Sequence, residues 1–260
     1  PTLAATVRSL NQTTLVYPPD AKTKYSNAAV AVVGAALESQ LNESHPEYVR
    51  KQILQPLEMN SSDFSVTPAV SSNLAEGWMR TYDGRRFPAP TFLLGTGPAG
   101  NLYSSVQDLA KFVSCLFRSG ATNNGRLVKP ETLAEMTTPA QDANGEPLAF
   151  GLGFHIQEID GHIQIGHGGA VYGFSTQLEA LPERKLGVVV AASLDGTNGV
   201  LRRISDYALR LMLAVQDEKP LPEYRTTVAL PADRAKALVG RYRQVDGQRH
   251  ARIEELDGQV

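Results

Sequence analysis

Cysteine is almost absent from this sequence. Cys115 is the single cysteine among 260 residues, which excludes an intrachain disulfide framework. One thiol fits either a reducing compartment or a large periplasmic domain, and of these we expect a periplasmic or secreted location in preference to the cytoplasm. Cys115 falls within a helical apolar pattern, which favours a buried core thiol over a reactive one.

Long apolar runs and runs of one charge are also lacking. A membrane helix needs about 18 to 20 apolar residues, whereas the longest apolar candidate covers only residues 28–37 and contains Gly34. The formal net charge is −2 and no Lys/Arg run occurs, so neither a membrane span nor a nucleic-acid partner is expected. The four histidines at 45, 155, 162 and 250 show no metal-ligand spacing, and we expect no metal and no cofactor.

What is present is a change of pattern along the chain, from helical periodicity to strands. Helices are expected at residues 4–10, 28–37, 46–53, 105–117, 130–137, 199–215 and 232–238. Strands are expected at 150–159, 162–166, 173–180 and 186–194, with Asp160-Gly161 as a hairpin turn. Short connections predict antiparallel pairing. The fold class is therefore α+β, a helical region plus an antiparallel sheet flanked by helices.

Three segments are expected. Residues 1–215 form one partial domain, with a helical part at about 25–147 and a sheet part at about 148–215. Residues 216–231 contain Pro220, Pro222 and Pro231 and are typical of a linker. Residues 232–260 begin a β-rich module. Because the sequence opens without methionine or a signal peptide and stops soon after this module begins, we expect a fragment.

Three short motifs could carry chemistry. Tyr25-Ser26-Asn27 precedes an apolar helix; a tyrosine hydroxyl can act as a base or proton relay where cations lower its pKa, but a surface tyrosine beside a helix cap is the simpler interpretation. Residues 97–101, Gly-Pro-Ala-Gly-Asn, form a tight loop that could line a pocket.

The third motif is His167-Gly168-Gly169-Ala170, placed at the end of one strand. Paired glycines allow another backbone to approach closely, and the N–H of Ala170 could point at a developing oxyanion. Taken alone, a glycine-rich hairpin with an exposed histidine is the simpler interpretation of this motif.

Together the motifs, in this order and with these flanking residues, resemble the penicillin-recognising serine hydrolases, in the branch of class C β-lactamases, DD-peptidases and esterases. The resemblance runs from about residue 10 to 215 and implies a β-lactamase/transpeptidase-like fold. It implies that Tyr25 is the base or proton relay and that Asn27, Gly168 and Gly169 contact the substrate. The family's third motif occurs as Lys-Thr-Gly or His-x-Gly, so the resemblance further implies that His167 replaces a lysine and that Ala170 supplies one oxyanion N–H.

The family's nucleophile motif, Ser-x-x-Lys, does not occur among the 260 residues. We expect it to lie in a missing N-terminal segment that completes the fold, so that this chain alone is inactive and poorly stable. The substrate is expected to be a small ester, amide or β-lactam. Histidine in place of lysine favours an esterase or peptidase over an efficient β-lactamase. The alternative is a non-catalytic binding or regulatory homologue.

Overall fold

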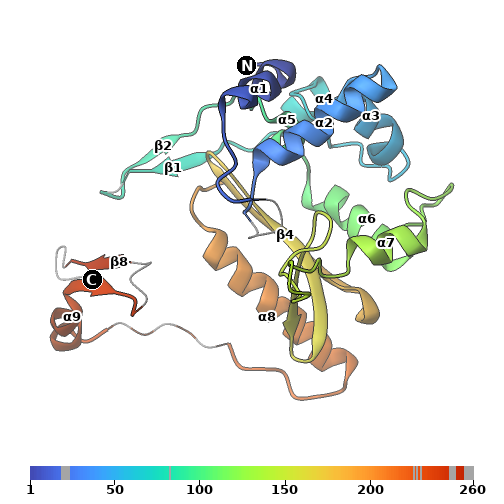
Figure 1. The fold of residues 1–260 in the computed structure, drawn as a ribbon. Helices are drawn as coiled ribbons and strands as arrows, with labels where there is room; N and C mark the ends of the chain where they lie inside the picture. Colours follow the sequence, from blue (N-terminus) through green and yellow to red (C-terminus); the bar gives the residue numbers. More distant parts are fainter. Residues whose placement is uncertain are drawn as a thin grey trace. The chain divides into compact units, whose positions relative to one another are not determined.

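The computed structural model describes residues 1–18, 24–81, 83–224, 226, 228, 230–245 and 250–254. They belong to two compact units, residues 1–221 and 222–260. The first unit holds most of the described helices and the main sheet (Figure 1).

The helical part of the first unit largely follows the predicted pattern. Its elements are α1 (Leu3–Ser9), η1 (Leu10–Gln12), α2 (Asn27–Leu41), α3 (His45–Val49), η2 (Arg50–Leu54), α4 (Pro68–Ser71), α5 (Gly97–Gly100), α6 (Val106–Phe117) and α7 (Pro130–Met136). The helix predicted at 46–53 is real but divides, because α3 continues into the π-helical turn η2. The region 60–100 is less irregular than predicted, since it also contains a hairpin of β1 (Trp78–Arg80) and β2 (Arg86–Pro88).

Helix α6 begins as the sequence predicts, with Ser105 as its N-cap. The Asp108 N–H donates to Ser105 Oγ at 3.2 Å, which satisfies one of the free amides of the first turn. We expect Ser105→Ala to lower the free energy of unfolding by about 1 kcal/mol, measured by urea denaturation of the intact protein. Ser114→Ala, an exposed serine of the same helix, is the control; an equal loss there would contradict the capping role.

The main sheet has four antiparallel strands in the order β3-β4-β5-β6. They are β3 (His155–Ile159), β4 (His162–Val171), β5 (Phe174–Leu181) and β6 (Leu186–Ala192), with η3 (Pro182–Arg184) between the last two. The predicted start of the first strand at 150 is wrong. Gly153 has a φ of +83°, a left-handed conformation that does not occur in a regular strand. Strand β3 therefore starts at His155, two residues after Gly153.

Each face of this sheet is covered by helices (Figure 1). On one face, Leu181 packs against Leu209 and Leu213 of helix α8 (Asn198–Gln216). On the other face, Ile165 and Ala180 pack with residues of α6 and α7, the buried members being Val113, Leu116 and Leu133. Strand residues alternate between the faces. A side chain's position in β4 or β5 therefore decides whether it meets α8 or α6.

Helix α2 is apolar almost throughout, yet among its fifteen residues only Ala31 and Gly34 are buried. Val30, Val32 and Val33 are 42–60% exposed. Gly34 is where α2 meets α5, because a Cβ at this position would clash with the Pro98 ring. The close approach of these two helices therefore requires glycine at position 34.

The second unit contains helix α9 (Ala232–Leu238), as predicted, followed by the antiparallel pair β7 (Gly240–Arg243) and β8 (His250–Ile253). Tyr242 Oη donates to the carbonyl of Leu238 at 2.7 Å, which ties the pair to the end of α9.

Candidate active site

Two of the predicted motifs, far apart in the sequence, meet in the structure. The ring centroids of Tyr25 and His167 lie 6.1 Å apart with an angle of 37° between the ring planes. Both side chains are exposed, Tyr25 to 61%. A solvent-accessible phenol therefore stands beside a solvent-accessible imidazole, an arrangement suited to moving a proton at the protein surface.

Tyr25 is held by the start of helix α2. Ser26 is the N-cap, and its Oγ accepts the Ala29 N–H at 3.2 Å. Asn27 is the first residue of the helix and is exposed. The triplet thus sits at the point where an extended segment turns into the helix, which fixes Tyr25 immediately outside it.

His167 lies within strand β4, not at its end as the sequence predicted. The predicted strand was too short because glycines lower strand propensity, whereas the ladder to β5 continues through Gly168 and Gly169 to Val171. Nδ1 of His167 is 2.6 Å from the carbonyl oxygen of Gly168. A carbonyl can only accept, so Nδ1 carries the hydrogen, and in the neutral ring Nε2 is the nitrogen that can take a proton.

The edge of β4 is open beside the histidine motif. In the described part of the chain, β3 pairs with residues 162–166 of β4 and no further. A two-residue turn joins β4 to β5, so Val171 and Phe174 form a hydrogen-bonded pair. Backbone N–H and C=O groups point toward β5 at every second residue of β4, which includes Val171 and Gly169. The N–H groups of Gly168 and Ala170 therefore face the other way, toward the open edge.

Asn198, which carries no motif in the sequence, links this segment of β4 to β5 by hydrogen bonds. Its Nδ2 donates to the carbonyl oxygens of Gly169 at 2.8 Å and Thr176 at 3.4 Å. Asn198 is the first residue of α8 and follows the turn at 195–196. A single asparagine at a helix start predicts a cap and nothing more, so only the fold could show that it reaches two strands.

The glycines of β4 make room for polar side chains of β5. A Cβ at Gly166 would clash with the carboxyl group of Glu179 and with the Leu178 carbonyl, and a Cβ at Gly168 would stand 2.9 Å from Gln177 Oε1. Glu179 and Gln177 lie two and four residues before Leu181 and so share its α8 face. His167, opposite Leu178 in the register, lies on the other face.

Glu179 is a buried acid. It is 2% exposed, and burial raises its pKa to about 7; the Gln177 hydrogen bond and the Arg202 charge oppose this, while the Asp206 charge adds to it. An acid whose pKa is higher in the folded protein stabilises the fold below its unfolded pKa, and this stability is lost as pH rises through the folded value.

We therefore expect the free energy of unfolding of the intact protein to fall by roughly 3 kcal/mol between about pH 4.5 and pH 8 through Glu179. Glu179→Gln should abolish this part of the slope, measured by urea denaturation at several pH values. Glu158→Gln, an exposed glutamate on β3, is the control and should leave the slope intact. A wild-type slope in Glu179→Gln would contradict the assignment.

The glycine-rich loop at 97–101 takes a supporting position. Residues 97–100 form α5, which packs on α2 through Pro98. Asn101 bonds the backbone of Leu94 twice, at 2.9 and 3.1 Å. The contacts described for this segment are thus helix packing and two hydrogen bonds to the backbone.

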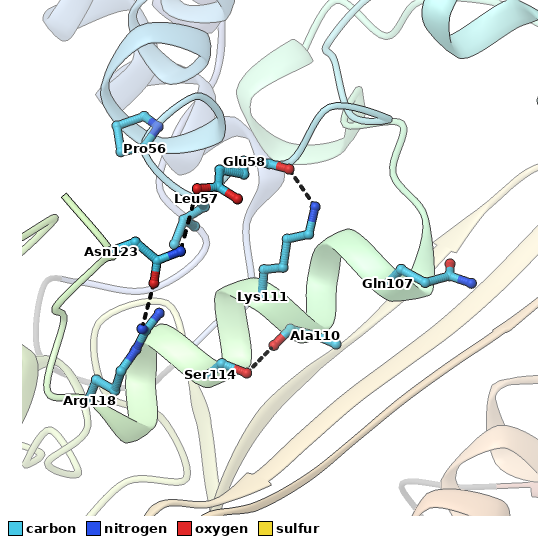
Figure 2. A pocket seen from close by; sticks show the side chains of 9 residues that line it. All are labelled: Pro56, Leu57, Glu58, Gln107, Ala110, Lys111, Ser114, Arg118 and Asn123. Atoms are coloured by element: carbon cyan, nitrogen blue, oxygen red, sulfur yellow. Dashed lines mark hydrogen bonds between the residues drawn. The ribbon is translucent and has the colours of Figure 1, made fainter.

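A cavity of about 250 Å³ lies elsewhere, between α6 and the turn after η2 (Figure 2). Lys111 donates to the carbonyl of Glu58 there, and Arg118 Nη1 donates to Asn123 Oδ1 at 3.0 Å. None of the residues lining this cavity belongs to the Tyr25 or His167 motif. The cavity is therefore separate from the candidate site formed by the aromatic pair and the open edge of β4.

Within the described ranges, no cluster of three His, Cys, Asp or Glu side chains is arranged to bind a metal ion. No helix in the same part of the chain is both long and apolar enough to cross a membrane.

The helix-flanked antiparallel sheet, with a tyrosine at a helix start beside a histidine where the edge of β4 is open, is typical of the β-lactamase/transpeptidase class of α+β folds. The octameric penicillin-binding protein homologue from Pyrococcus abyssi shares this fold. Its TM-score is 0.71, with 27% identity over 99% of this chain and 56% of that one. Residues 2–211 match the family model described as Beta-lactamase, and the chain belongs to that family.

Relatives from distant organisms match the same region. The human protein called putative beta-lactamase-like 1 is 27% identical over 82% of this chain and 43% of its own length. The D-aminopeptidase of Cereibacter sphaeroides is 24% identical over 67% of this chain and 32% of its own length. The chain thus spans about half or less of the relatives that it matches, and the family includes hydrolases of amide bonds.

Proposed function

We propose that the protein containing this chain is a serine acyl hydrolase that works through an acyl-enzyme. The observation that carries the proposal is the meeting of Tyr25 and His167, with ring centroids 6.1 Å apart, beside the open edge of β4. The nucleophile would be the serine of a Ser-x-x-Lys motif outside the printed 260 residues.

In this proposal the serine attacks the substrate carbonyl, and Tyr25 takes the serine proton directly or by relay. This proton passes to the alcohol or amine that leaves as its bond to the carbonyl carbon breaks, and water then cleaves the acyl-serine bond. His167, whose Nε2 can accept or carry a proton, stabilises the negative charge of the Tyr25 phenolate and contacts the substrate. The Ala170 N–H, which faces the open edge, donates to the oxyanion of the tetrahedral intermediate. Asn27, Gly168 and Gly169 would line the substrate path at the same edge.

The proposed substrates are small esters or amides, with D-amino-acid peptides as the first amide class to try. A D-aminopeptidase among the relatives motivates this choice. Histidine at 167 attracts a substrate carboxylate less strongly than a permanent ammonium would, which disfavours an efficient β-lactamase.

The test uses the intact protein. We expect a fluorophosphonate probe to label one serine, located by peptide mass spectrometry, and a D-amino-acid p-nitroanilide or p-nitrophenyl ester to be hydrolysed. Mutation of the labelled serine to alanine should abolish both signals. An intact protein without a Ser-x-x-Lys motif, or one that takes up no probe and hydrolyses neither substrate, would favour a non-catalytic binding homologue instead.

A further inference from the structure

The strand that carries the histidine motif lies over a layer of buried polar side chains. Gln164, Gln177 and Glu179 are 1%, 9% and 2% exposed. Gln177 Nε2 donates to Glu179 Oε1, and the side chain of Gln164 also hydrogen-bonds to Glu179. Burying three such groups costs free energy unless each is paired, and here they are paired with one another.

The layer continues toward the surface through α8 and β3. Gln164 Nε2 donates to Asp206 Oδ1 at 3.4 Å, and Gln157 Nε2 donates to Gln164 Oε1 at 2.8 Å. Arg202 in turn donates to Gln157. The chain of hydrogen bonds thus joins Glu179 to two charged residues of α8.

The polar side chains of this layer that come from β5 pack directly against the glycines of β4. Glu179 stands opposite Gly166 and Gln177 opposite Gly168 in the register, and each polar side chain occupies the space that a Cβ on its partner would need. His167 lies between these two glycines. A change in the shape or charge of Glu179 therefore acts on the backbone on both sides of the histidine.

We infer that Glu179 is a positioning residue for the 167–170 segment: together with Gln177 it supports β4 from the α8 face and so fixes the His167 ring and the Ala170 N–H. The role in turnover rests on the proposed function, but the support of the strand does not.

The charges around Glu179 make this support dependent on pH. Asp206 and Arg202 are the charged groups that α8 presents to Glu179. The neighbouring strands present Gly166 and Gln164 from β4 and Val188 from β6. Ionisation of Glu179 near pH 7 places a negative charge beneath the strand, where it opposes a developing oxyanion.

The kinetic experiment compares the intact wild-type protein with Glu179→Gln and Glu179→Ala from pH 5.5 to 9. Glu179→Gln keeps the shape and stays neutral, so its kcat should match the wild type at pH 6 and be about fivefold higher at pH 8.5. Glu179→Ala leaves a void, and we expect about tenfold lower kcat with little change in KM, the pattern of a lost transition-state contact. Glu158→Gln on β3 should follow the wild type throughout.

A second readout needs no turnover. Selective ¹⁵N-glycine labelling reports the amides of Gly166, Gly168 and Gly169, assigned by substitution. In the wild type these signals should shift with a midpoint near pH 7, and Glu179→Gln should remove that shift.

Two results would overturn the inference: the same pH-dependent shift in Glu179→Gln, or wild-type kcat and amide signals in Glu179→Ala. Should Glu179→Ala fail to fold, the isosteric Glu179→Gln alone decides through the lost shift. A protein without hydrolysis or probe labelling would refute the proposed function, and the amide signals would still decide the role of Glu179.

Discussion

Tyr25→Phe should lower the kcat of the intact protein by about 10²- to 10⁴-fold, the usual range for loss of a positioned general base. The substitution removes one hydroxyl group from a side chain that is 61% exposed. The ring contact with His167, at 6.1 Å between centroids, can persist. We therefore expect unchanged thermal stability and a loss confined to kcat and to the rate of probe labelling.

Tyr172→Phe is the matched control for this experiment. Tyr172 lies in the turn between β4 and β5 and is 53% exposed, and its ring centroid lies 5.4 Å from that of Phe92 with 49° between the ring planes. Loss of the Tyr172 hydroxyl group should change kcat by less than about threefold, the scale of a surface substitution. A Tyr25→Phe protein with near wild-type kcat would remove Tyr25 from the proton path and, with it, the main support for the proposed mechanism.

Ala170→Pro should lower kcat by about 10²- to 10³-fold, the cost of removing one oxyanion donor. Proline lacks an N–H, and this N–H faces the open edge of β4, so the ladder to β5 loses no hydrogen bond. The sheet should therefore form normally. Stopped-flow acylation with a p-nitrophenyl ester measures the effect directly.

Ala170→Gly keeps the N–H and serves as the control, with an expected change in kcat of less than about fivefold. If Ala170→Pro hydrolysed the ester at the rate of Ala170→Gly, the oxyanion donor would have to be another group. Circular dichroism spectra of the two variants would show whether both retain the sheet.

The sequence predicted the elements better than their limits. Residues with clear local signals were placed well: Ser105 caps its helix, and Asp160-Gly161 forms the hairpin turn with φ values of 50° and 83°. The strand start at 150 was wrong because the pattern does not show the left-handed Gly153. The predicted end of β4 was wrong because glycines lower the strand propensity of the segment, although pairing with β5 continues to Val171.

The candidate site could be predicted only in part, because local sequence signals indicate motifs but not the contacts between them. Tyr25 and His167 were found as motifs, yet nothing local indicates that they meet. Asn198 and Glu179 carry no motif at all, because their roles depend on which backbone lies across from them. Contacts between distant segments are determined by tertiary packing, whereas a single sequence indicates only which residues are chemically able to make such contacts.

The glycine at position 168 also bears on how this family's motif can change. The form Lys-Thr-Gly carries threonine at that place, whereas here a Cβ would stand 2.9 Å from Gln177 Oε1. Threonine adds further atoms beyond the Cβ, so the strand accepts it only after Gln177 has become smaller or moved. The two positions are therefore coupled: a threonine at 168 requires the end of the Gln177 side chain to move, and a smaller residue at 177 removes that requirement.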